Sequence, residues 1–148
     1  MVDADHSRLI LEMGVIMIYG AIEPATGVIA ERRYCIGRTI HTSEVTSCIV
    51  VVCPVGTKLI GIHLSIFGTG DDDGNDAAPF REEEADRVGE ILRQNDADIS
   101  RANIFGVIDC WDSQIPGYDR LMAVLQNPPE HRKHWRSGTL TITAADLT

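Results

Sequence analysis

The residues of this chain best suited to do chemistry are a cysteine and a histidine, Cys48 and His63. A thiolate is a nucleophile, and an imidazole beside it can take the thiol proton, so the pair is the minimum apparatus for a cysteine nucleophile. Residues 47–53 and 58–66 are rich in β-branched side chains, and a Pro-Val-Gly-Thr segment at 54–57 separates them. We therefore expect a β-hairpin that carries the thiol and the imidazole on neighbouring strands.

The register of this hairpin decides whether the two side chains meet. With a turn centred on Val55 and Gly56, Cys48 faces His63 directly, and directly opposed Cβ atoms lie about 5 Å apart on one face. A symmetric four-residue loop over 54–57 gives the same pairing. A three-residue loop with Gly56 in a bulge shifts the register by one residue and turns His63 to the other face. The sequence permits the first geometry and does not force it.

The segment that leads to the cysteine, Thr-Ser-Glu-Val-Thr-Ser-Cys at 42–48, resembles the signature of the chemotaxis glutamine deamidases (CheD). That family carries a Thr six residues before the Cys of a Leu-Gly-Ser-Cys-like turn, and a His on the next strand shortly after a Gly. The Cys-to-His spacing also resembles the catalytic domain of the cytotoxic necrotizing factor toxins, and the lethal-factor deamidases share a similar arrangement. The residues in matching positions are Thr42, Ser47, Cys48, Gly61 and His63.

The chain also departs from the chemotaxis family. Thr46 stands where that family has a Gly, and Leu-Ser-Ile-Phe-Gly at 64–68 stands where the family continues with an apolar residue and Met-Leu-Pro. The resemblance covers residues 40–68, with a weaker echo in a helix at 83–94 and a strand at 102–109. It implies membership of the superfamily and not a chemotaxis protein.

The resemblance implies a fold and an activity. The fold is α+β, with a mixed β-sandwich core flanked by helices as in the CheD and necrotizing-factor catalytic domains. The activity is that of a cysteine hydrolase that converts a protein glutamine to glutamate, in a bacterial toxin or effector that acts on a protein of the target cell. Cys48 would be the nucleophile, His63 the base and Thr42 the residue that orients the imidazole. The reaction needs neither a cofactor nor a metal.

Other interpretations of the same residues stay open. The chain could be a non-catalytic binding or regulatory domain in which Cys48 and His63 are merely buried, or the site could act as a transglutaminase or a cysteine peptidase. His41 is a competing base, although alternation along a strand lets only one of His41 and Thr42 face the site. We expect the N–H groups of Ser47 and Cys48 to form an oxyanion hole. We also expect Gly61 to leave room for a substrate.

Length and charge narrow the class of protein. A chain of 148 residues predicts a single domain over residues 1–148. The net charge of −9 argues against nucleic acid and anionic membrane as partners. No apolar run reaches the ~20 residues of a membrane span, and the acidic start is unlike a signal peptide. We expect a soluble protein, in the bacterial cytoplasm or delivered to a target-cell cytosol, whose partner is a protein substrate with a reactive glutamine; an inhibitory partner protein is compatible with this.

The remaining cysteines and an acidic loop look structural. Cys35, Cys53 and Cys110 form no Cys-x-x-Cys pair, so we expect buried free thiols and no metal site. Residues 68–76 are rich in Asp and Gly, and a calcium loop would need Gly at its sixth position, where the chain has Asp76. We expect a solvated loop there, which could gate the site.

The hydrophobic pattern predicts the elements that carry these residues. Amphipathic stripes predict helices at 82–94 and 118–125, the first opening on three glutamates. Apolar or alternating runs predict strands on both sides of the hairpin. These strands are expected at 8–13, 15–19, 28–36, 38–41, 102–109 and 138–143.

Overall fold

The computed structural model describes residues 20–21, 28–29, 32–45, 47–66, 79–126, 129–135 and 138–148. The strands expected at 8–13 and 15–19 and the acidic loop at 68–76 lie outside these residues, so their predictions stay untested.

The strands of the described residues form two sheets. The larger has six strands in the order β1-β3-β6-β5-β7-β8, in which the pairs β1–β3 and β7–β8 are parallel and the others antiparallel. Its strands are β1 (Gly20–Ala21), β3 (Arg33–Gly37), β5 (Ile49–Val55), β6 (Lys58–Leu64), β7 (Asn103–Gly106) and β8 (Arg132–His134). The smaller sheet has the order β2-β4-β9, with β2 (Val28–Ile29), β4 (Ile40–Thr42) and β9 (Thr141–Ile142).

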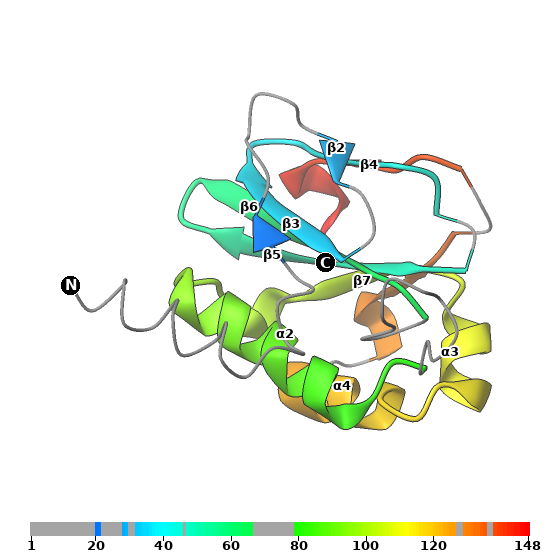
Figure 1. Ribbon diagram of the computed structural model, residues 1–148. Coiled ribbons are helices and arrows are strands. Elements are labelled where there is room, and N and C mark those ends of the chain that lie inside the picture. Colours follow the sequence, from blue (N-terminus) through cyan, green and yellow to red (C-terminus); the bar gives the residue numbers. More distant parts are fainter. Residues whose placement is uncertain are drawn as a thin grey trace.

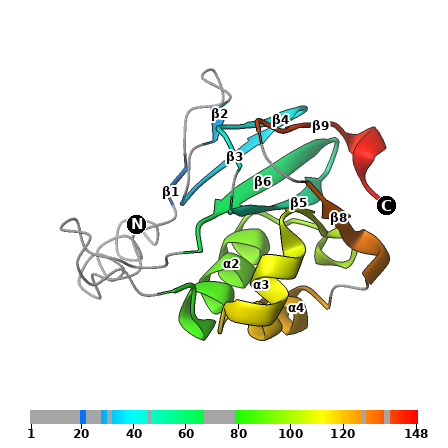
Figure 2. The same cartoon turned by 90° about the vertical axis from the view of Figure 1, so that its right-hand side faces the viewer.

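The larger sheet lies between the smaller sheet and the helices (Figures 1 and 2). Its helical face is covered by α2 (Glu82–Gln94), α3 (Ile108–Gln114) and α4 (Tyr118–Leu125). The expected α+β class, with mixed sheets and flanking helices, is confirmed. In the described ranges, no helix is both long and apolar enough to cross a bilayer.

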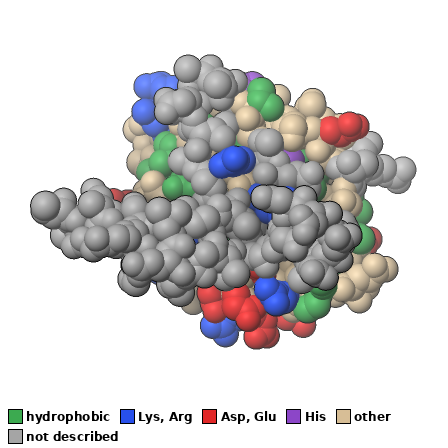
Figure 3. Space-filling view, viewed as in Figure 1, with side chains coloured by type: hydrophobic (Ala, Val, Ile, Leu, Met, Phe, Trp, Pro, Cys, Tyr) green, Lys and Arg blue, Asp and Glu red, His purple; other side chains and the backbone are tan. Residues whose placement is uncertain are grey.

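Helices α2 and α4 have the bounds that their apolar stripes predict. At the start of α2, the Arg81 N–H donates to the Glu84 carboxylate at 2.8 Å, which satisfies one of the amide donors that a helix start leaves open. Gly89 lets the two helices approach closely, because a Cβ there would lie 2.6 Å from Cγ1 of Val124. The exposed side of α2 is acidic, with Glu82, Glu83, Asp86 and Glu90, and Figure 3 shows red side chains gathered over the helical layer.

The alternation of side chains along the central strands separates two hydrophobic clusters. Ile49, Val51 and Cys53 of β5 face the helices, together with Ile60 and Ile62 of β6. The opposite face of the larger sheet packs against the smaller sheet. We call the buried residues there the inter-sheet cluster: Ile29, Cys35, Ile40, Val45, Cys48, Val50, Val52, Leu59, Phe105, Leu140 and Ile142.

Some predicted strands differ from the observed elements. The run at 28–36 divides into β2 and β3, and Arg32 between them has a left-handed φ of 61°. The run at 102–109 ends as a strand at Gly106, whose φ is 149°, and α3 follows it. The run at 138–143 keeps only the two residues of β9, and β8 was not predicted.

Candidate active site at the β5–β6 hairpin

The β5–β6 hairpin forms as predicted, but its register is shifted by two residues. Val50 and not Cys48 lies opposite His63, and Val55 pairs with Lys58. The turn therefore consists of Gly56 and Thr57. Gly56 has a φ of 60°, and glycine is favoured at the first central position of a tight hairpin turn. The expectation that Cys48 faces His63 directly was wrong, because the strand continues through Pro54 and moves the turn by one residue.

A shift of two residues leaves both side chains on the same face of the sheet, because the side-chain period of a strand is two. Cys48 belongs to the inter-sheet cluster together with Val50, which pairs with His63. Cys48 and His63 are thus diagonal neighbours, a relation that sets Cβ atoms about 7–8 Å apart in regular sheet. The register, continued one step past its last pair, sets Cys48 opposite Ser65, which is also buried.

The His63 imidazole is anchored by a backbone oxygen. Its Nδ1 lies 2.8 Å from the Ile29 carbonyl oxygen on strand β2. A carbonyl can only accept, so Nδ1 carries the hydrogen and Nε2 is the basic nitrogen of the neutral ring. The same oxygen accepts from the Ser43 N–H at 3.1 Å and from the Ser43 hydroxyl at 3.4 Å. Strands of the smaller sheet thereby fix the tautomer and orientation of a histidine on the larger sheet.

Thr42 lies close to this anchor but makes a different contact from the one expected. Its hydroxyl accepts a hydrogen bond from the Leu140 N–H at 3.1 Å, so it joins β4 to the segment that leads into β9. Thr42 is paired with Ile29 in the ladder of β2 and β4. The group that orients the imidazole is therefore the Ile29 carbonyl, and Thr42 supports the strand that supplies it. No side-chain pattern could have identified Ile29, because it acts through its backbone.

The structure also places His41 and Gly61, two further residues that were expected to affect the site. His41 is exposed, and its Nδ1 lies 3.2 Å from the Thr141 hydroxyl, so the strand alternation turns it away from the inter-sheet cluster. A Cβ on Gly61 would lie 2.6 Å from Cγ2 of Ile40. Ile40 fills the space that Gly61 was expected to leave for a substrate, so that expectation was wrong.

The backbone at Ser47 is held from the helical side of the sheet. The indole N–H of Trp111 in α3 donates to the Ser47 carbonyl at 2.7 Å. Gly106 of β7 lies close to the backbone of Cys48, since a Cβ on Gly106 would lie 2.5 Å from the carbonyl oxygen of Cys48. Trp111 is fully buried, and its indole N–H also fixes the backbone at the candidate nucleophile.

The four cysteines differ in how far their side chains are exposed to solvent. Cys48 is 4% exposed and His63 is 0% exposed, and Cys35 and Cys53 are also buried, whereas Cys110 is partly exposed. Cys53 faces the helices, away from His63, as its parity predicts. Burial, with a smaller effect of the Asp98 charge, raises the pKa of Cys53 to about 12. Cys53 is thus an inert thiol, and Cys110 is a natural reference for a thiol whose reactivity follows exposure.

No metal centre is found in the described part of the chain, where no three His, Cys, Asp or Glu residues are grouped to hold an ion. Comparison of the chain with family models, with curated proteins and with solved structures gives no match.

Proposed function

We propose that this protein is a protein-glutamine deamidase in which Cys48 is the nucleophile and His63 the general base. The observation that carries the proposal is the anchored imidazole. Nδ1 of His63 donates to the Ile29 carbonyl at 2.8 Å, on the sheet face that also holds Cys48. This arrangement leaves Nε2 as the proton acceptor, which is what activation of a thiol requires.

The proposed reaction has two halves. In the first, Nε2 of His63 takes the thiol proton and the sulfur of Cys48 attacks the carboxamide carbon of a glutamine. The imidazolium returns that proton to the departing ammonia, and a thioester remains. In the second, His63 takes a proton from water, the hydroxide attacks the thioester carbon, and the proton returns to the thiolate as glutamate leaves. The sum is hydrolysis of an amide, with no oxidant, metal or cofactor.

The resemblance of residues 42–48 and of His63 to the glutamine deamidases supports the choice of reaction and of substrate class. By the same resemblance, the substrate is a protein of a target cell and the chain acts as a toxin or effector. The net charge of −9 favours a basic surface on that substrate. An amine in place of water would turn the same site into a transglutaminase.

A second function is favoured by one specific observation, the burial of the pair. Cys48 is 4% exposed and His63 is 0% exposed. A substrate side chain can therefore reach the sulfur of Cys48 only after the residues that bury it move. A non-catalytic binding domain would need no such opening. The two functions differ in whether Cys48 reacts at all, which makes its chemistry the deciding property.

The direct test is release of ammonia from glutamine. The purified protein is incubated with a capped Gln-Gly dipeptide and with a cell lysate, and ammonia and the mass gain of about 1 Da at glutamine are measured. Cys48→Ser and His63→Asn should each lower the rate by at least about 1,000-fold. Cys53→Ala is the matched control, because Cys53 lies on the same strand and faces the other way. Activity that survives in Cys48→Ser would refute the proposal.

A further inference from the structure

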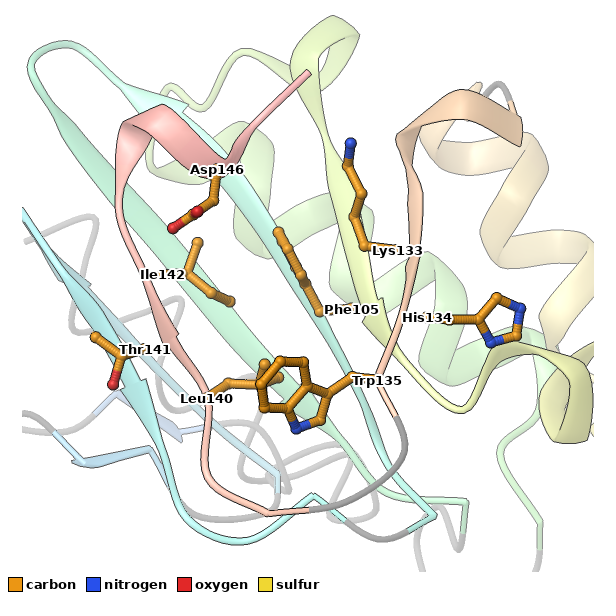
Figure 4. A pocket seen from close by; sticks show the side chains of 8 residues that line it. All are labelled: Phe105, Lys133, His134, Trp135, Leu140, Thr141, Ile142 and Asp146. Carbon is orange, nitrogen blue, oxygen red and sulfur yellow. The ribbon is translucent and has the colours of Figure 1, made fainter.

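A pocket of about 270 Å³ opens between strands β8 and β9 (Figure 4). Phe105, Leu140 and Ile142 form its floor, and all three belong to the inter-sheet cluster that contains Cys48. The Trp135 indole, which is 39% exposed, forms one wall. The volume lies just below the ~300–1,000 Å³ of pockets for drug-sized ligands, so a single side chain is a suitable occupant.

Charged groups line the rim of this pocket, and each has a partner within the protein. Lys133 donates to the hydroxyl of Thr148, and the His134 ring lies 3.5 Å from the Asp109 carboxylate. The carboxylate of Asp146 accepts from the Thr143 N–H at 2.8 Å. Each charged group of the rim thus has a partner within the protein, and Phe105, Leu140, Ile142 and Trp135 make the larger part of the lining apolar or aromatic. The pocket therefore favours an apolar ligand over a charged one.

The pocket is connected to the candidate active site by the register of the sheet. Phe105 pairs with Val50, and Val50 pairs with His63, so the three residues form one row across β7, β5 and β6. Two strand spacings separate Phe105 from His63, which is about 10 Å. An extended peptide advances about 3.3 Å per residue, so a side chain in the pocket belongs to a residue within about three positions of a glutamine at Cys48.

The strands beside the pocket favour an extended occupant. β8 is the last strand of the larger sheet and β9 the last strand of the smaller one. In the described residues neither strand has a second neighbour, and edge strands present backbone donors and acceptors to an added strand. Figure 4 shows the two strands on opposite sides of the pocket, with Phe105 behind it.

We propose that this pocket is a specificity subsite that binds an apolar side chain, aliphatic or aromatic, near the target glutamine of the substrate protein. The inference rests on the proposed function for the identity of the substrate. It rests on the pocket itself for the chemistry of the side chain. An apolar pocket distinguishes side chains by about 10–200-fold per methylene, so the subsite would contribute a measurable sequence preference.

The test uses acetylated, amidated peptides with a central glutamine and Leu, Ala or Lys at each position up to three residues away. At one position at least, the Leu peptide should have a kcat/KM about tenfold or more above the Ala and Lys peptides. Trp135→Ala should reduce this preference toward unity, and Trp135→Phe, which keeps an aromatic wall, should retain it. Equal rates for Leu, Ala and Lys, or a preference that survives Trp135→Ala, would overturn the subsite.

Binding without chemistry separates this inference from the proposed function. In Cys48→Ser, the Leu peptide should shift the fluorescence of Trp135 at lower concentrations than the Ala peptide, while the fully buried Trp111 supplies a constant background. Tighter binding of the Leu peptide to Cys48→Ser, together with no deamidation by the unsubstituted protein, supports the pocket and refutes the enzyme. Deamidation without a Leu preference supports the enzyme and refutes the subsite.

Discussion

Nδ1 of His63 lies 2.8 Å from the carbonyl oxygen of Ile29, a contact that joins the two sheets of the molecule at the candidate active site. The histidine is on strand β6 of the larger sheet and the carbonyl is on β2 of the smaller one. The imidazole is therefore oriented by tertiary structure and not by its neighbours in sequence. Changes in the smaller sheet should alter the site without touching Cys48 or His63.

Thr42 provides the first test of this coupling. Thr42→Val removes the hydroxyl that accepts from the Leu140 N–H, which leaves a donor unpaired between the sheets and should lower the free energy of unfolding by about 1–3 kcal/mol. Thr42→Ser keeps the acceptor and should cost less. Urea denaturation measures both variants. We expect Thr42→Val to lose less activity than Cys48→Ser; complete loss of activity at unchanged stability would instead assign the hydroxyl a direct role at the imidazole.

Gly106 should control the position of Cys48, the proposed nucleophile. Gly106→Ala introduces a Cβ 2.5 Å from the Cys48 carbonyl oxygen at a φ of 149°, so it should displace residue 48 and cost about 1–3 kcal/mol from backbone strain alone. Gly56→Ala is the matched control, because its φ of 60° is also strained but no atom lies within 4 Å of the added Cβ. Both should be less stable in urea, and only Gly106→Ala should lower the reactivity of the Cys48 thiol. Equal effects on that thiol would contradict the role of Gly106.

The raised pKa of the Cys53 thiol should make the protein less stable at alkaline pH. Burial raises the pKa of its thiol from 9.0 to about 12 in the folded protein. Below pH 9 the thiol is neutral in both states, and between about pH 9 and 12 only the unfolded chain loses the proton, so stability falls with rising pH across this window. Cys53→Ala should show a flatter dependence there in urea titrations at stepped pH. Tyr118, whose pKa is also raised, contributes to both proteins. Parallel curves for the two proteins would contradict the prediction.

The sequence predicts helices α2 and α4 and the face of the hairpin, but it predicts neither helix α3 nor the register of the hairpin. The stripes of α2 and α4 are long enough to define their bounds. Pro54 looks like a strand breaker, yet it lies within β5. Strand β5 pairs with β7 only as far as Val52, so the missing N–H of Pro54 removes no hydrogen bond from the β5–β7 ladder. The strand therefore runs on to Val55. The register differs from the predicted one by two residues, which is one full side-chain period, so Cys48 and His63 still lie on the same face of the sheet.

Other features of the site could not be predicted because they depend on backbone groups or distant packing. The Ile29 carbonyl has no side-chain signal, and the Trp111 indole meets Ser47 only after the chain has folded. Strand β8 is short and basic, as edge strands often are, so it lacks the apolar alternation of a central strand. Gly106 did carry a signal, since an isolated glycine in an apolar run marks a close approach of another backbone.

The central claim, that His63 activates Cys48, is tested most directly by competition among the thiols. The protein is treated with limiting iodoacetamide at about pH 6.5 and the modified cysteines are mapped, since only a thiol of lowered pKa reacts quickly there. We expect Cys48 to be labelled before the more exposed Cys110, Cys53 to stay unmodified, and His63→Asn to abolish the lead of Cys48. Preferential labelling of Cys110, with Cys48 modified only when the protein unfolds, would refute the activation of Cys48 by His63 and favour a non-catalytic binding domain.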